Sequence, residues 1–185
     1  MIPIGYMAKR IVPKPDWLKA DQVDDVLSVS SCISEDFTDW INYWRHNGYW
    51  LFDSPEVIIA IAEENGIDLT TARWFYYEAH ENECDEDGES WMEIVPEERF
   101  AVEIAVPSRH RLAGFDVVTY SLGNSAECSP LSCNNIAEHV RVNSHCLLDS
   151  FEDAKVSISE KAYLDAEPGP LRIIAVYETP PPQRK

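Results

Sequence analysis

The residues with the clearest chemical potential in this sequence are cysteines and histidines gathered in the stretch AECSPLSCNNIAEHVRVNSHC. This stretch covers residues 126–146 and holds Cys128, Cys133, His139, His145 and Cys146. Cysteine and histidine are the usual protein ligands of zinc, and a cysteine beside a histidine base can act as a nucleophile. The chemistry to consider is therefore metal binding, thiol redox exchange or nucleophilic catalysis.

The spacing of these side chains argues against a structural zinc site. Such sites usually contain two close ligand pairs, as in C-x₂-C or H-x₃-H. Here four residues separate Cys128 from Cys133, and five separate Cys133 from His139. His145 and Cys146 are adjacent, so on a strand they would point to opposite faces. We therefore expect neither a metal ion nor another cofactor.

A cysteine nucleophile fits the same stretch better than zinc does. Cys133 stands in PLSC, where the pattern predicts a loop that leads into a short helix, and a helix N-terminus stabilises a thiolate. The catalytic candidates are Cys128 or Cys133, with His139 or His145 as the base. A C-x-x-C redox motif is absent. The alternative to these functional interpretations is a structural one, because a free cysteine is most often buried as a small apolar side chain.

Charge is the strongest global property of the chain. The sequence has 15 basic and 33 acidic side chains, a formal net charge of −18, and residues 78–103 hold 1 basic and 11 acidic residues, or −10. Such a surface attracts basic proteins or cations and repels nucleic acid phosphates and anionic membranes. We expect a basic protein partner, and no binding to nucleic acid or membranes. The predicted contact residues are Glu83, Asp85, Glu86, Asp87 and Glu89.

Calcium binding and a plain hairpin are the alternatives for this acidic segment. Glu83, Asp85, Asp87 and Gly88 match positions 1, 3, 5 and 6 of a calcium loop, but Ile94 stands where the twelfth position needs glutamate. Asp87-Gly88 is also a signal for a tight hairpin turn. On that interpretation the acidic side chains are only solvated.

The remaining pattern predicts helices and strands in mixed order. Serines at 34, 54 and 150 precede apolar-periodic runs and predict helix N-caps. The predicted helices cover residues 34–46, 55–65 and 150–162, with a short one after 130. The predicted strands cover residues 26–34, 48–54, 72–80, 100–108, 114–122 and 171–178. The pattern predicts an α+β domain with a mixed, mostly antiparallel sheet of about five to seven strands and three or four helices. No internal repeat is evident.

The chain has the length of a single domain, residues 1–185. Prolines within residues 1–20 predict an extended N-terminal arm, and ETPPPQRK at 178–185 predicts a Pro-rich tail. No apolar run approaches the roughly 18 residues of a membrane span, and the N-terminus lacks a signal-peptide pattern. The odd number of cysteines agrees with a cytoplasmic location.

These observations predict a non-enzymatic, acidic cytoplasmic binding protein that sequesters or masks a basic protein. The composition resembles that of immunity proteins and antitoxins, which are small acidic proteins that sequester another protein. The alternative is a small enzyme that uses a cysteine nucleophile and a histidine base on a small molecule. The usual signatures G-x-S-x-G, H-E-x-x-H, G-x-G-x-x-G and the Walker loop are absent.

Overall fold

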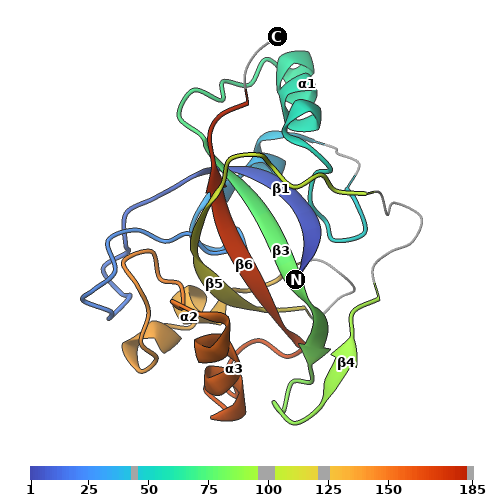
Figure 1. Ribbon diagram of the computed structural model, residues 1–185. Coiled ribbons are helices and arrows are strands. Elements are labelled where there is room, and N and C mark those ends of the chain that lie inside the picture. The colour runs from blue at the N-terminus through green and yellow to red at the C-terminus, as the bar shows by residue number, and fades with distance from the viewer. Residues whose placement is uncertain (43–45, 96–102, 121–125, 183–185) are drawn as a thin grey trace.

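The protein is built around a curled antiparallel sheet of six strands (Figure 1). The computed structural model describes residues 1–42, 46–95, 103–120 and 126–182. The strands are β1 (Ile2–Arg10), β2 (Glu35–Asp36), β3 (Arg73–Cys84), β4 (Trp91–Glu93), β5 (Arg111–Thr119) and β6 (Leu171–Thr179). Their order is β2-β1-β3-β6-β5, with β4 also pairing with β3. Every one of these pairings is antiparallel.

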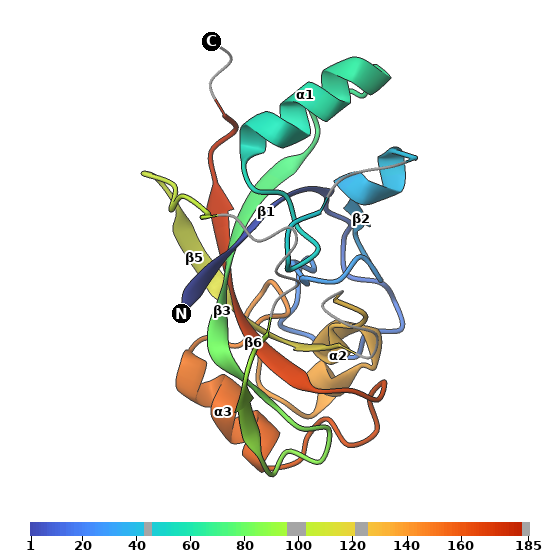
Figure 2. The same cartoon turned by 90° about the vertical axis from the view of Figure 1, so that its right-hand side faces the viewer.

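In the described part of the chain, three α-helices complete the predicted α+β fold. They are α1 (Pro55–Asn65), α2 (Pro130–Cys133) and α3 (Phe151–Ser159). Two 3₁₀ turns accompany them: η1 (Phe37–Trp40) follows β2, and η3 (Ile136–Glu138) lies between α2 and α3. Helices α1 and α3 lie at opposite ends of the sheet, and the loops that carry β2 and α2 lie together on one side of it (Figure 2). Within the described residues, no helix is long and apolar enough to cross a membrane.

Residues near both ends of the chain form strands of the sheet, although the sequence predicted an arm and a tail there. The predicted N-terminal arm is wrong for residues 2–10, which form β1 and are largely buried. Pro3 is tolerated because the ladder is interrupted between Pro3 and Gly5. At the other end, β6 continues through Thr179, so the first two residues of the predicted tail lie in a strand.

Several predicted elements are absent from the described residues before β5. Residues 26–34 and 48–54 form irregular loops instead of strands. The helix predicted over 34–46 is replaced by β2 and η1, and its residues 43–45 lie outside the described residues. The strand predicted over 100–108 is not formed by residues 103–108, and the rest of it lies outside the description.

Two halves of the chain repeat the same order of strand, long loop, helix and strand. The first half contains β1, α1 and β3, and the second contains β5, α3 and β6. The antiparallel β3–β6 pair lies between β1 and β5, so the two strands of each half occupy equivalent places in the sheet order β1-β3-β6-β5. The sequence analysis missed this internal repeat, because the shared order of strands and helices becomes visible only in the fold.

An asparagine-centred loop before each helix carries the repeat most clearly. The loops are NGYWLFDS (47–54) and NSHCLLDS (143–150). Asn47 Nδ2 donates to the Ile4 carbonyl at 2.9 Å, and Asn143 Nδ2 donates to the Ala113 carbonyl at 2.9 Å. The Oδ1 atom of each asparagine accepts hydrogen bonds from two amides of its own loop. The same side-chain contacts thus fix the same loop twice.

The serines predicted to begin α1 and α3 are N-cap residues, but only one makes a side-chain cap. Ser150 Oγ accepts a hydrogen bond from the Asp153 amide at 3.1 Å, whereas the Ser54 side chain makes no cap bond. We expect Ser150→Ala to lower the free energy of unfolding by about 1 kcal/mol and Ser54→Ala to lower it by a few tenths. Urea denaturation of both variants checks this, and equal losses would contradict the cap assignment.

Candidate functional site: a cluster of three cysteines

Three cysteine side chains from both halves of the chain meet at one point. The Sγ atoms of Cys32, Cys128 and Cys133 all lie within 4.8 Å of one another. Cys32 is exposed, Cys133 is partly buried, and Cys128 is buried. The sequence analysis named Cys128 and Cys133 as candidates and missed Cys32. The alternation of residues 26–34 predicts a strand around Cys32, and residue spacing cannot show a contact made across the fold.

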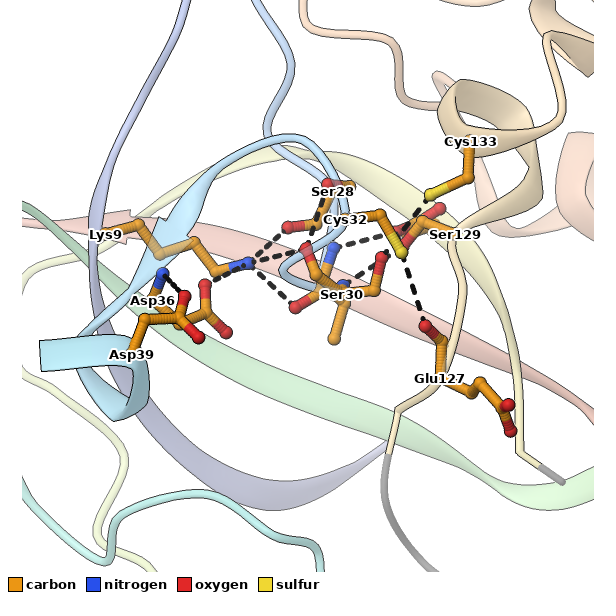
Figure 3. Close-up of polar contacts among 11 residues, drawn as sticks. Lys9, Ser28, Ser30, Cys32, Asp36, Asp39, Glu127, Ser129 and Cys133 are labelled. Atoms are coloured by element: carbon orange, nitrogen blue, oxygen red, sulfur yellow. Dashed lines mark hydrogen bonds and ion pairs between the residues drawn. The ribbon is translucent and has the colours of Figure 1, made fainter. Parts of the chain in front are cut away.

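A buried lysine on β1 holds the loop that leads to the first thiol (Figure 3). Lys9 Nζ donates to the carbonyls of Ser28 at 2.6 Å, Val29 at 2.7 Å and Ser30 at 3.2 Å. It also forms an ion pair with Asp36 at 2.9 Å. Burial raises the pKa of Asp36 to about 6, against the lowering effect of the Lys9 charge. These carbonyls are satisfied by an ammonium group instead of by a neighbouring strand, so the loop keeps an irregular shape.

A buried carboxylate on β5 joins this loop to the one that carries the other two thiols. Asp116 Oδ2 accepts hydrogen bonds from the Val29 amide at 2.8 Å and from Ser129 Oγ at 2.6 Å. Ser129 Oγ accepts in turn from the Ser30 amide at 3.1 Å. Burial raises the pKa of Asp116 to about 6, although the bonds from Ser129 and Val29 lower it. The two cysteine loops are therefore fixed to each other before any ligand arrives.

The two loops also share a short sequence pattern. Ser28–Cys32 reads SVSSC, and Ser129–Cys133 reads SPLSC, so both follow S-x-x-S-C. Each pattern follows the first strand of its half and precedes the asparagine-centred loop. Cys32 and Cys133 thus both end an S-x-x-S-C pattern, one in an irregular loop and the other in α2. This recurrence is the signal in the sequence that could have identified Cys32.

The contacts within the cluster favour a negative charge on the exposed sulfur. Hydrogen bonds from Cys128 and Cys133, followed by those from Ser30 and the charge of Lys9, lower the pKa of Cys32 well below its ordinary value, although burial opposes them. Hydrogen bonds with Cys133 and Cys32, together with burial, raise the pKa of Cys128. The cluster therefore favours a thiolate at Cys32 over one at Cys128 or Cys133, although protonated Cys32 can also donate to the Glu127 carbonyl at 3.3 Å.

The pKa of Cys133 is raised to about 11. Its hydrogen bond with Cys128 lowers the value, but the hydrogen bond and charge of Cys32 and partial burial raise it more.

The other candidates from residues 126–146 lie elsewhere. His145 Nδ1 pairs with Asp25 Oδ1 at 2.6 Å, and His139 is exposed at the end of η3. Cys146 is buried in the apolar core, where burial raises the pKa of its thiol to about 12. The structure thus brings a third thiol, and not a histidine base, to Cys128 and Cys133.

A small cavity borders the loop that precedes Cys32. Its volume is about 100 Å³, and its polar wall includes Ser30, Ser31, Asp36 and Tyr120. Enclosed sites for drug-sized small molecules usually measure about 300–1,000 Å³. Within the described residues, the cavity is too small to enclose such a substrate, so a reaction partner reaches the exposed sulfur from solvent.

The predicted acidic binding residues lie in the hairpin formed by β3 and β4, which has Asp87-Gly88 in its turn. Three of its five predicted binding residues have partners inside the protein. Asp85 accepts from the amides of Glu89 at 2.7 Å and Ser90 at 3.1 Å. Arg172 Nε donates to Glu83 at 2.7 Å, and Lys161 Nζ donates to Glu89 at 2.9 Å.

The outer side of this hairpin offers a surface that other proteins could contact. Glu86 and Asp87 are exposed at the tip. Trp91, Met92 and Val95 are exposed apolar side chains in and beside β4. Within the described part of the chain, β4 pairs with β3 alone, so its second edge has no strand partner.

Comparison with known proteins provides no relative from which to transfer a function. No protein-family model matches the chain, and no curated protein or solved structure is significantly similar to it.

Proposed function

We propose that this protein is a thiol–disulfide redox protein in which Cys32 is the attacking thiolate and Cys133 the resolving thiol. The observation that carries the proposal is the approach of Cys32 and Cys133 Sγ within 4.8 Å on two loops fixed to each other. An exposed thiolate next to a second thiol is the usual arrangement of redox-active cysteines. This replaces the cysteine–histidine enzyme that the sequence suggested as an alternative.

The reaction proceeds in two exchanges. The Cys32 thiolate attacks one sulfur of a disulfide substrate, which breaks the substrate S–S bond, forms a mixed disulfide and releases one thiolate. Cys133 then loses its proton and attacks Cys32 Sγ, which forms the internal disulfide and releases the second thiolate. Two electrons pass from the two cysteines to the substrate. A disulfide has an S–S length of about 2.05 Å, so the two sulfurs must approach further during the second step.

Cys133 suits the resolving role better than Cys128. The Cys128 carbonyl accepts a hydrogen bond from the Thr119 amide at 2.9 Å, and its Sγ donates to Asn134 Oδ1 at 3.3 Å. Its side chain is also only 2% exposed. Cys133 is partly exposed at the end of the single-turn helix α2, where a shift of its sulfur disturbs less structure.

The proposal includes a cytoplasmic location. None of the five cysteines forms a disulfide in this structure. A reducing compartment would keep the cluster in the thiol form that the first exchange requires.

The reaction with glutathione disulfide tests the proposal. We expect the wild type to form an internal Cys32–Cys133 disulfide and Cys32→Ser to lose the reaction. Cys133→Ser should accumulate a mixed disulfide at Cys32, as shown by mass spectrometry of peptides under non-reducing conditions. Cys84→Ser and Cys146→Ser are matched controls, because both replace buried cysteines outside the cluster. Oxidation of Cys32→Ser at the wild-type rate would refute the proposal.

A second candidate function, docking of a basic protein, is supported by the outer edge of the β3–β4 hairpin. A strand with a free edge can pair with an extended segment of another chain, and nearby negative charge accelerates the encounter with a basic partner. The contact residues we propose are Glu86, Asp87, Trp91 and Met92. Glu83, Asp85 and Glu89 contribute charge, but their carboxylates are already engaged within the protein.

Charge neutralisation tests the docking function. We expect Glu86→Gln with Asp87→Asn to reduce the capture of basic proteins from source cells at low salt, with a smaller effect at high salt because screening weakens it. The control pair, Glu63→Gln with Glu64→Gln, removes two exposed charges from α1. Equal capture by both double variants would rule out the hairpin as the contact.

A further inference from the structure

Cys128 stabilises the Cys32 thiolate but forms no covalent bond in the two-thiol reaction proposed above, and its sulfur completes the cluster. We infer that Cys32, Cys128 and Cys133 together bind one Zn²⁺ ion through three thiolates, with the fourth position open to water. The inference goes beyond the proposed redox function, although it shares two of its cysteines. It also reverses the expectation of no metal, which considered only the ligands within residues 126–146.

The separations of the three sulfurs suit a zinc ion. Zinc–sulfur bonds measure about 2.3 Å, so two sulfurs of a tetrahedral site lie about 3.8 Å apart. The three Sγ atoms already lie within 4.8 Å of one another. Binding therefore requires each separation to close by at most about 1 Å.

The surroundings of the sulfurs provide the support that metal ligands usually have. Ser30 Oγ lies 3.7 Å from Cys133 Sγ, where a hydroxyl can donate to a thiolate. Cys128 Sγ donates to Asn134 Oδ1 at 3.3 Å, a hydrogen bond that its thiolate would lose on binding the ion. The Ser30 loop is itself held by Asp116, Ser129 and Lys9, so the ligands need little reorganisation. Three thiolates and Zn²⁺ leave one negative charge, which the buried ammonium of Lys9 partly offsets.

The cluster has three protein ligands instead of the four of a closed structural site. Within the described residues, no other histidine, cysteine or carboxylate joins the group of atoms lying within 4.8 Å of one another. Cys32 is exposed, so water can reach the ion from its side. Three protein ligands and one water are typical of catalytic zinc sites, whereas structural zinc sites have four protein ligands and no bound water.

Zinc titration of the reduced full-length chain, in competition with a chromophoric chelator, tests the inference. We expect the wild type to bind one equivalent of Zn²⁺ and to release protons on binding. Replacing Cys32, Cys128 or Cys133 by Ser should weaken binding by about 100-fold or more, judged from the 10–100-fold loss when only a supporting residue is replaced. Cys84→Ser and Cys146→Ser should bind like the wild type.

The Cys128→Ser variant separates this inference from the redox function. We expect it to lose zinc binding and still to form the Cys32–Cys133 disulfide with glutathione disulfide, at a lower rate near neutral pH because the Cys128 hydrogen bond no longer stabilises the Cys32 thiolate. A second readout needs no variant: Zn²⁺ should protect Cys32, Cys128 and Cys133 of the wild type from alkylation and leave Cys84 and Cys146 unaffected. Substoichiometric zinc in the wild type, wild-type affinity in Cys128→Ser, or no protection of the cluster would each overturn the inference.

Discussion

Lys9→Met is expected to lower the free energy of unfolding by about 3–5 kcal/mol, the range for breaking a buried ion pair. The substitution leaves the Asp36 carboxylate buried without its cation and removes the donor from three loop carbonyls. Buried polar groups without partners are costly, so the loss exceeds that of an ordinary surface charge. Guanidinium denaturation, monitored by tryptophan fluorescence, measures it.

Arg10→Met is the matched control for this prediction. Arg10 is the next residue of β1 and pairs with Glu35 of β2, as Lys9 pairs with Asp36, but the Arg10 side chain is 41% exposed. Its ion pair and its position over the Trp40 ring are expected to contribute about 1–2 kcal/mol together. A loss for Lys9→Met no larger than that for Arg10→Met would show that the buried ammonium does not organise the loop.

Gly5→Ala and Gly114→Ala are each expected to lower the free energy of unfolding by about 2–5 kcal/mol. Both glycines have positive φ, +142° and +150°. A Cβ atom at Gly5 would lie 2.6 Å from Leu51 Cβ, and one at Gly114 would lie 2.7 Å from Leu147 Cβ. Each asparagine-centred loop would have to move away from its strand.

The control for the glycine pair is Gly66→Ala at the end of α1. Gly66 has a φ of +67°, but a Cβ there would meet nothing within 4 Å. We expect a loss of about 1 kcal/mol from backbone strain alone. Similar losses for Gly5→Ala and Gly114→Ala, both larger than this one, support the structural repeat. A loss at only one of them would mean that the two loops are not equivalent.

Much of the regular structure could be predicted from local sequence. Ser54, Pro55 and Gly66 mark the two ends of α1. Aromatic and β-branched runs identify most of β3, β5 and β6. These elements form where local preference and the final packing agree.

The first half of the chain shows where local preference fails. Residues 26–34 alternate like a strand, yet the amides of Val29 and Ser30 bond to Asp116 and Ser129, and the neighbouring carbonyls bond to Lys9. These partners are distant in sequence, so no local pattern reveals them. Trp40 likewise lies in a 3₁₀ turn, η1, and not in a helix spanning residues 34–46.

The candidate site was only partly predictable for the same reason. Cys128 and Cys133 stood out because they lie close together in the sequence. Cys32 joins them only through the folding of the two halves, and His139 and His145, which also lie nearby in sequence, do not join. The repeated S-x-x-S-C pattern was a usable signal, but it gains meaning only once the fold shows the same order of strands and helix in both halves.

The most direct test of the thiol site is the pH dependence of the alkylation rate of each cysteine, measured by mass spectrometry after brief treatment with iodoacetamide. An ordinary thiol has a pKa of about 8.5, so its rate rises about tenfold per pH unit below that value. Because the neighbouring thiols stabilise its thiolate, Cys32 should react fastest and at a nearly constant rate from pH 6 to 8. Cys128→Ser and Cys133→Ser should each restore part of the pH dependence. A tenfold rise per pH unit for Cys32 in the wild type, or a rate no higher than that of Cys84 or Cys146, would contradict a stabilised thiolate at this site.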